Sequence, residues 1–284
     1  MSLALISPTT FTDTSLPLFP LEAVPGTLLL IEPARSPSVV GVPASGAILP
    51  DRSGWLVGAG AELRYANMTA GIGLMERTSK GGIHSIKTPA SQFAHAGIIP
   101  SAAVVQYMLD NIGHEFYIGI QGRITRPGLS GNDAHFAMSF SATAGTSQLL
   151  VASMADANTY PSTSVLKGAK KYPLTSMVSP AAPSAVFAAA GMKGYTGSIT
   201  RTAADIIANR MASLFNVGSS GPFNSGNAGA ASKVFYRAII EDVTVSGRNF
   251  AALSAMDYSF FEAEVLTPGG RYYGDTFTAP SAIP

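Results

Sequence analysis

Cysteine is absent from this 284-residue chain, and charge is scarce in it. Without thiols, the chain has no disulfides, thiolate nucleophiles or cysteine-ligated metal sites. Charged residues make up 12% of the chain, about half the share usual in soluble domains. The formal net charge of +1 gives no general attraction to nucleic acid or to an anionic membrane. A surface with so little charge is expected on a protein that neighbours cover in an oligomer or a large particle.

Long apolar runs are also missing. The N-terminal stretch has neither a basic start nor a continuous apolar segment, so it does not match a secretory signal peptide. The longest apolar run near it, residues 27–31, is too short to cross a bilayer. We therefore expect that the chain does not insert into a membrane and that it assembles in a reducing cytoplasm.

Glycine and proline are plentiful instead, with 29 and 19 residues, more than a typical domain contains. The hydrophobic fraction of 46% excludes wholesale disorder. Many turns and little charged helix surface favour strands joined by loops. The sequence therefore predicts a mainly β protein with a sizeable core and a few short helices.

Proline and loop-forming residues divide the chain. Eight prolines up to residue 50 predict an extended N-terminal arm over residues 1–50. Weak periodicity and many Ser, Thr, Pro and Gly residues predict a loop and helix insertion around 155–232 in a main domain of residues 51–266. Residues 267–284 form a C-terminal tail, and we expect the arm and the tail to dock onto other proteins.

Periodicity predicts the elements of the main domain. β-branched and aromatic residues favour strands, and we expect them at 54–66, 70–77, 114–128, 134–145 and 147–154. Apolar residues at helical spacing predict two helices. The first, at 101–111, is capped at its start by Ser101, and the second, at 201–216, by a capping pair of Thr202 and Asp205.

The stretch 235–265 (FYRAIIEDVTVSGRNFAALSAMDYSFFEAEV) reads as a strand, a turn at Ser246-Gly247 and a helix. Glu241 and Asp242 crowd the turn as if they were a catalytic pair. Adjacent residues of a strand point to opposite faces, so the two carboxylates cannot flank one glycosidic bond. We expect one of them to pair with Arg237 or Arg248. Asp257 in the helix should pair with a nearby arginine or cap an open backbone group.

Two segments carry a resemblance to a known family. They are HEFYIGIQGRITRPG, which contains RITR at 123–126, and YRAIIEDVTVSGR at 236–248 with the helix behind it. Both resemble concanavalin-like jelly-roll modules of tailed-bacteriophage virion proteins. About 45 residues match in detail, within a common order of elements over 50–265. The resemblance implies a jelly-roll sandwich and a structural place in a virion.

Other chemistry finds little support in the sequence. All four histidines, His84, His95, His114 and His135, fall within 52 residues, but no metal-binding spacing such as His-Glu-x-x-His is present. Turn histidines at strand ends explain them better. The glycine-rich stretches 58–61 and 71–73 lack the strand and helix context of a nucleotide site. We expect no catalytic residues, metal or cofactor.

Loop aromatics offer a second kind of site, because aromatic rings stack on sugars and also bury well at protein interfaces. The candidates are Trp55, Tyr160, Tyr172, Tyr195, Phe223, Tyr272 and Tyr273. Interface packing is favoured, because a single tryptophan is few for a lectin.

These observations lead to one expectation and two alternatives. We expect a structural component of a tailed-phage virion, on the tail, neck or capsid surface, which assembles as an oligomer in the host cytoplasm through contacts with other virion proteins. The first alternative is a receptor-binding, lectin-like module for host-surface glycan. The second, a glycan-degrading enzyme, would need two converging carboxylates, and the sequence offers no convincing pair.

Overall fold

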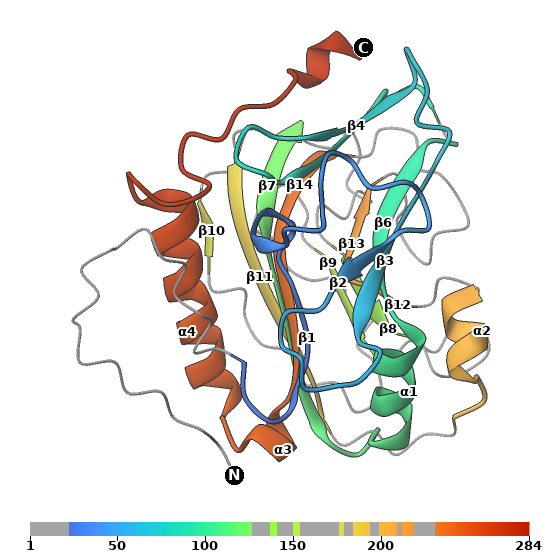
Figure 1. The fold of residues 1–284 in the computed structure, drawn as a ribbon, viewed down its shortest axis with the longest axis vertical. Helices are drawn as coiled ribbons and strands as arrows, with labels where there is room; N and C mark the ends of the chain where they lie inside the picture. The colour runs from blue at the N-terminus through green and yellow to red at the C-terminus, as the bar shows by residue number, and fades with distance from the viewer. Residues whose placement is uncertain are drawn as a thin grey trace.

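A computed structural model describes the chain over residues 23–91, 93–126, 137–140, 150–153, 176–178, 184–193, 199–208, 212–217 and 231–283. Within these ranges the protein is mainly β, with antiparallel sheets and a few short helices, as the sequence predicts. Figure 1 shows α4 (Phe250–Phe261) on one side of a long sheet and a second sheet on the other side.

The larger sheet has seven strands in the order β10-β11-β7-β14-β5-β4, and β1 also pairs with β14. Their bounds are β1 Thr27–Ile31, β4 Gly73–Arg77, β5 Ile83–Lys87, β7 Glu115–Arg126, β10 Ser176–Val178, β11 Ser184–Lys193 and β14 Ser232–Asp242. β5 and β1 share one edge of β14, β5 at residues 233–235 and β1 at 238–241. The other edge of β14 pairs with β7 along nearly its whole length.

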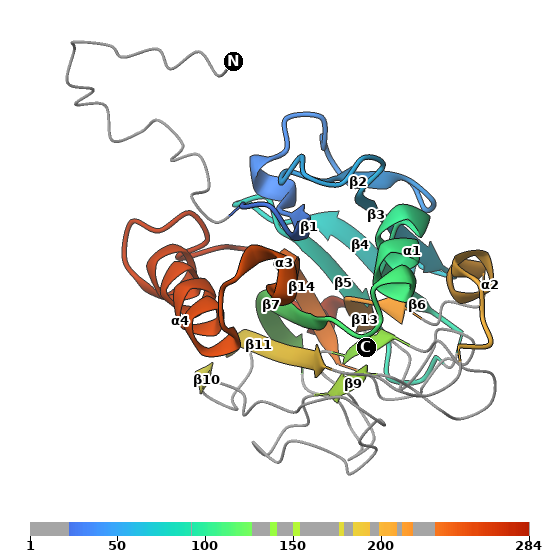
Figure 2. The same ribbon diagram turned by 90° about the horizontal axis from the view of Figure 1, so that it is seen from below.

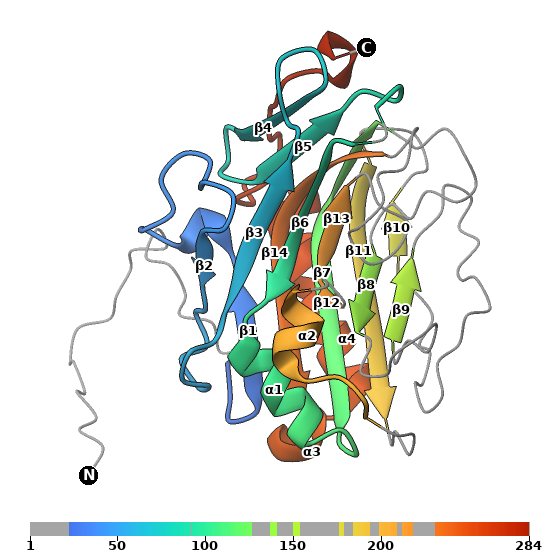
Figure 3. The same cartoon turned by 90° about the vertical axis from the view of Figure 1, so that its right-hand side faces the viewer.

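The smaller sheets complete the sandwich. A four-stranded sheet has the order β13-β6-β3-β2, and a three-stranded sheet has the order β12-β8-β9. Their bounds are β2 Ile48–Pro50, β3 Gly60–Ala66, β6 His95–Pro100, β8 Ala137–Phe140, β9 Leu150–Ser153, β12 Ala212–Ser213 and β13 Phe215–Val217. Figure 3 shows the four-stranded sheet in front of the seven-stranded one.

The helices lie at the ends and on the outer face. α1 (Ala102–Asp110) and α2 (Ala203–Ala208) pack together beside the four-stranded sheet, and α4 covers the outer face of β7, β11 and β14 (Figure 2). Short helical turns complete the set, and they are α3 Val243–Ser246, η1 Pro33–Arg35, η2 Glu262–Leu266 and η3 Pro280–Ala282.

Two hydrophobic clusters hold these layers together. The larger fills the space between the two sheets and takes side chains from β1, β3, β6, β7, β14 and α1. The smaller joins the outer face of the seven-stranded sheet to α4. Alternating residues of β14 feed the two clusters, with Ile240 in the first and Ile239 in the second, because successive strand side chains point to opposite faces.

The region predicted as an extended N-terminal arm, residues 1–50, contains two strands of the sheets, which corrects that prediction. Residues 27–31 form β1, whose five residues are all buried against β14. Residues 48–50 form β2, which pairs with β3. The apolar run Leu28–Ile31 overrides the surrounding prolines because it supplies core surface that the sheet buries. Residues 1–22 lie outside the described residues.

The C-terminal tail is also part of the domain rather than a free docking segment. Tyr272 is fully buried and stacks on Tyr236 with ring centroids 4.2 Å apart. Asp275 accepts hydrogen bonds from Ser79 Oγ and Tyr236 Oη at 3.1 and 2.9 Å. Arg126 donates to the carbonyl of Ile283 at 2.9 Å. These contacts fasten residues 272–283 over the end of the seven-stranded sheet.

The region predicted as an insertion supplies central elements of the fold. β11 pairs with β7 over ten residues. Alanine and glycine make up half of its sequence, SAVFAAAGMK, and both are weak strand formers. Pairing with β7, and not local propensity, therefore defines this strand.

The helix expected at 201–216 is only partly present. Thr202 and Asp205 form the predicted capping pair, and each side chain bonds the other residue's backbone N–H at 3.1 Å. The helix ends at Ala208, and residues 215–217 pair with β6 instead. Tertiary pairing outweighs the helical spacing here.

The closing strand is shorter than we predicted. β14 ends at Asp242, and residues 243–246 form the one-turn helix α3. The Asp242 side chain accepts a hydrogen bond from the backbone N–H of Val245 at 3.1 Å and so caps this turn. Gly247 ends it in the left-handed conformation, with φ of 70°. Other expected elements shift only at their ends, as where a strand predicted from residue 54 begins at Gly60.

Candidate functional site

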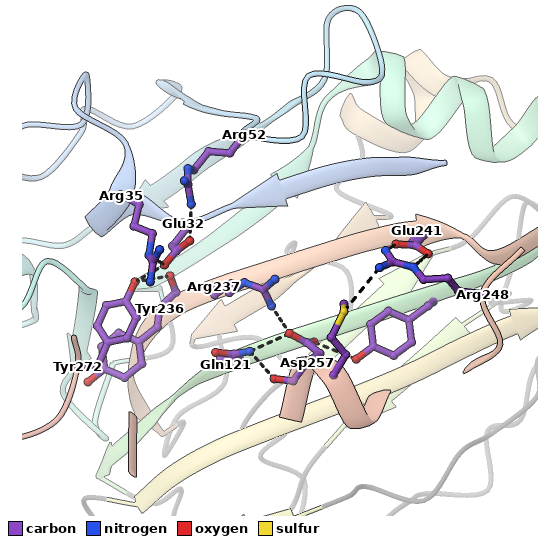
Figure 4. Close-up of polar contacts among 12 residues, drawn as sticks. Glu32, Arg35, Arg52, Gln121, Tyr236, Arg237, Glu241, Arg248, Asp257 and Tyr272 are labelled. Carbon is purple, nitrogen blue, oxygen red and sulfur yellow. Dashed lines mark hydrogen bonds and ion pairs between the residues drawn. The ribbon is translucent and has the colours of Figure 1, made fainter. Parts of the chain in front are cut away.

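The charged residues of the closing stretch lie on the two faces of β14, and Figure 4 shows Arg237, Glu241 and Arg248 among them. Glu241 faces the α4 side, where Arg248 donates to Oε1 from Nε at 2.7 Å and to Oε2 from Nη2. Thr27 Oγ1 also donates to Glu241, at 3.3 Å. Asp242 points to the opposite face, toward α1. The prediction that one of the two carboxylates pairs with Arg237 or Arg248 is confirmed by Glu241 and Arg248, and the two adjacent carboxylates do not converge.

Asp257 is the centre of the polar layer beneath α4. Its carboxylate forms an ion pair with Arg237, and both side chains are fully buried. Tyr117 Oη donates to Oδ2 at 2.9 Å, and Gln121 Nε2 donates to Oδ1 at 2.8 Å. A Cβ atom on Gly119 would overlap Oδ2, so this glycine lets the carboxylate lie against β7. Of the two roles expected for Asp257, the pairing with an arginine is confirmed.

Burial keeps the phenol of Tyr117 in this layer protonated. Desolvation, followed by the charge of Asp257, raises the pKa of Tyr117 well above its ordinary value. The phenol therefore stays a hydrogen-bond donor at neutral pH. A nucleophile or base needs an open approach and a pKa near the working pH, and Tyr117 has neither, because its ring is fully buried.

A second buried carboxylate, Glu32, binds the start of the chain to its end. It forms ion pairs with Arg35 at 2.6 Å and with Arg52 at 2.5 Å, and only 1% of its side chain is exposed. Tyr272 Oη donates to it at 3.4 Å. Figure 4 shows Glu32 between these arginines and the stacked rings of Tyr236 and Tyr272. This cluster therefore links β1, the loop after β2 and the C-terminal tail.

Asp242 performs a similar task on the inner face. Tyr107 Oη of α1 donates to its Oδ2 at 3.0 Å, and His114 Nδ1 lies 2.7 Å from the same oxygen. Burial, with the hydrogen bond and charge of Asp242, raises the pKa of Tyr107 to about 12. The three side chains tie α1 and the start of β7 to the end of β14.

The histidines have separate places. His84 is fully buried on β5, with Nδ1 2.7 Å from Glu76 Oε1 and Nε2 2.8 Å from Thr125 Oγ1. His114 contacts Asp242, His95 lies on β6, and His135 lies outside the described residues. Across the described ranges, no three His, Asp or Glu side chains are placed to hold a metal ion.

One open hollow lies on the outer face of the four-stranded sheet. It has a volume of about 310 Å³ and is lined by Ser45, Gly46, Glu62, Arg64, Tyr65 and His95. The strands that form its floor, β3 and β6, lie side by side in Figure 3. The neighbouring residues Ala61 and Leu63 point into the core, so alternation directs Glu62 and Arg64 outward.

The hollow presents a carboxylate and a guanidinium side by side. Arg64 donates to Glu62 from Nε at 2.5 Å and from Nη2 at 2.7 Å, and Nη1 donates to the carbonyl of Ile207 at 3.2 Å. Their side chains remain 23% and 19% exposed. Gly97 lies opposite Arg64 across the strand pair and leaves the floor without a side chain there. The sequence reasoning missed this pair, although the alternation of Glu62, Leu63 and Arg64 signals an outward polar face.

The predicted aromatic candidates do not form one site. Trp55 is half-buried and packs edge-on against Tyr107, with centroids 5.5 Å apart. Tyr272 is fully buried, so the expectation of an available ring is wrong there, because its stacking on Tyr236 anchors the tail. Tyr273 is 44% exposed. The remaining candidates, Tyr160, Tyr172, Tyr195 and Phe223, lie outside the described residues.

Comparison with known proteins identifies no family. No protein-family model and no curated protein matches the chain. A Trypanosoma rangeli sialidase in complex with 2,3-difluorosialic acid matches 82% of the chain with 12% identity and a TM-score of 0.37. The binding domain of botulinum neurotoxin serotype D/C matches 82% with 10% identity and a TM-score of 0.34. The chain spans 33% of the first and 52% of the second. Likenesses this weak carry no information about ligand or activity.

None of the helices in the described part of the chain is long and apolar enough to cross a membrane.

Proposed function

We propose that this chain is a structural protein of a tailed-bacteriophage virion. It acts through protein–protein contacts as an oligomer on the tail, neck or capsid surface, and not as an enzyme. The observation that carries the proposal is the position of the two segments that resemble this family. They form β7 and β14, which pair at the centre of the large sheet, and the helix after β14 covers that sheet. The resembling residues therefore form one structural unit.

The distribution of charge supports the same role. The two carboxylates that first suggested catalysis are bound within the fold, Glu241 by Arg248 and Asp242 by Tyr107 and His114. Two further buried carboxylates pair with arginines, Asp257 with Arg237 and Glu32 with Arg35. Buried ion pairs of this kind hold elements in place and are not open to a substrate.

Apolar side chains on the surface offer places for assembly contacts. Val57 and Val40 are 93% and 86% exposed, and Ile48 on β2 is 58% exposed. β2 is the edge of the four-stranded sheet in the described residues. Exposed sheet edges and aliphatic side chains are surfaces that partner proteins cover.

The test is the presence of the chain in intact particles. Purified particles encoded by the same genome, probed by immunogold electron microscopy and quantitative mass spectrometry, should contain the chain at a fixed position and copy number. The variant I48K/V57D should keep the wild-type melting temperature and be depleted from particles. Particles that lack the chain altogether would overturn the proposal.

Truncation is not a substitute for this test. A deletion through residue 40 removes β1, whose residues are buried in both clusters, and should unfold the domain. Loss of such a variant from particles would not report on docking.

A further inference from the structure

We propose that the hollow formed by Ser45, Gly46, Glu62, Arg64, Tyr65 and His95 is a binding site for a neutral saccharide. The proposal does not rest on the virion role, because it follows from the chemistry of the hollow and its rim. It differs from the aromatic site expected from the sequence, since none of the seven candidate aromatics lines this hollow.

The donors and acceptors in the hollow suit sugar hydroxyls. An arginine has five N–H groups, and Arg64 gives three hydrogen bonds, two to Glu62 and one to Ile207. Its two other N–H groups have no acceptor in the described part of the chain. Each Glu62 oxygen accepts one of the bonds from Arg64 and keeps a further lone pair. Neighbouring hydroxyls of a sugar both donate and accept, so they match this pair.

Charge argues against an anionic ligand. The carboxylate of Glu62 balances the guanidinium of Arg64 at 2.5–2.7 Å. A phosphate or sulfate that approaches Arg64 also approaches Glu62, which repels it. A neutral ligand gains the hydrogen bonds without that repulsion.

The floor of the hollow is rigid, and its size suits a small ligand. Glu62 and Arg64 lie on β3, where β6 pairs with both residues and β2 pairs with Glu62. Sites built on strands hold their polar groups in place better than sites on loops. The volume of about 310 Å³ lies at the lower end of ligand sites, which favours a single sugar ring with its substituents.

A loop next to the hollow carries an exposed aromatic residue. Phe93 is 73% exposed. Its carbonyl accepts a hydrogen bond from Asn67 Nδ2 at 3.1 Å and lies 3.1 Å from Nδ1 of His95. The loop that carries Phe93 is therefore fixed to the rim. An aromatic residue carried by a loop at the rim can supply a ring that stacks on the apolar face of a sugar.

The experiment is calorimetric titration of the full chain with neutral probes: maltotetraose, chitotetraose, mannotriose and galactobiose. Heparin disaccharide is the anionic comparison, and a decapeptide of alternating Ser and Ala is the peptide comparison. At least one neutral saccharide should bind more tightly than either comparison. E62Q should weaken that binding about tenfold, because a hydrogen bond to a charged group is lost. F93A should weaken it about fivefold, because the stacking surface is lost.

Matched variants separate the hollow from the surface in general. Glu262 is an exposed carboxylate after α4, and Tyr273 is an exposed ring in the tail. E262Q and Y273A should leave the affinity unchanged, and all four variants should keep a free energy of unfolding within about 1 kcal/mol of the wild-type value. The proposal is wrong if no neutral saccharide binds at ~10 mM, if an anionic saccharide or the peptide binds more tightly, or if E62Q and F93A bind as well as wild type. None of these results would bear on whether the chain is present in particles, so the test of the proposed function is independent.

Discussion

Arginine–carboxylate pairs occur in two different settings on opposite sides of the sandwich. Beneath α4, Arg237 and Asp257 are both completely buried, and β7 supplies two further donors to the carboxylate. On the outer face of the four-stranded sheet, Glu62 and Arg64 form the same kind of pair but keep about a fifth of their surface exposed. The first pair is closed to any ligand, whereas the second lines an open hollow.

This difference separates a role in folding from a role in recognition. A buried charge that has lost its partner destabilises the folded state, so the closed pair of Arg237 and Asp257 determines whether α4 packs against the sheet. An exposed pair contributes little to stability, so the polar groups of Glu62 and Arg64 can serve in binding a ligand. Stability and binding should therefore respond to different substitutions.

The largest effect is expected from breaking the closed pair. D257A leaves Arg237 without its carboxylate and removes the acceptor for Tyr117 and Gln121. The free energy of unfolding should fall by about 3–5 kcal/mol in urea titrations. D110A, in which an exposed carboxylate of α1 is removed, is the control and should change it by less than about 0.5 kcal/mol. Equal stability of the two variants would show that the buried network does not hold α4.

An effect of intermediate size is expected from pH, through the hydrogen-bonded pair of His84 and Glu76. Burial lowers the pKa of His84, and the hydrogen bond and charge of Glu76 and the charge of Asp275 offset this only in part. Burial alone would raise the pKa of Glu76, but hydrogen bonds from His84 and Thr278 lower it overall. Both groups therefore have folded-state pKa values below their unfolded ones.

The sign of the pH dependence follows from these directions. As pH falls below about 6.5, the unfolded chain protonates His84 before the folded chain does. Stability is thus lost toward acid, by at most about 1.4 kcal/mol per pH unit for this histidine. Glu76 adds its own loss only below its unfolded pKa of about 4.3. H84Q keeps the polar contacts without this titration, so urea unfolding at pH 7.5 and 5.5 should show a smaller acid loss than wild type. An identical loss in both proteins would contradict the assignment.

The smallest effect on stability is expected in the hollow. E62Q should change the free energy of unfolding by less than about 1 kcal/mol, because the pair with Arg64 is partly solvated. The same urea titration used for D257A measures it. A loss as large as that of D257A would mean that the hollow is a structural element, and the contrast between the two pairs would disappear.

Much of the fold follows from local patterns in the sequence. The strands β7 and β14 and the helices α1 and α4 follow from periodicity, and the capping pair Thr202–Asp205 follows from its spacing. The sequence also predicts an ion pair between one carboxylate of the turn and Arg237 or Arg248, but not which carboxylate forms it. What local patterns cannot supply is long-range pairing. β11 is an alanine-rich strand defined by β7, and β13 interrupts a helical pattern because it pairs with β6.

The hollow was harder to foresee for the same reason. Glu62 and Arg64 lie two residues apart on β3, and their outward direction can be read from the sequence. Ser45 comes from the loop before β2 and His95 from β6, and only the sheet brings these to the same place. The aromatic prediction relied on loop position, which does not distinguish buried Tyr272 from exposed Phe93.

The most direct test of the contrast is a crystal structure of the chain with a bound neutral oligosaccharide. We predict a sugar ring hydrogen-bonded to Glu62 and Arg64. The positions of α4 and of the buried Arg237–Asp257 pair should be the same with and without the sugar. A sugar bound elsewhere on the protein, or no sugar bound at saturating concentration, would contradict it.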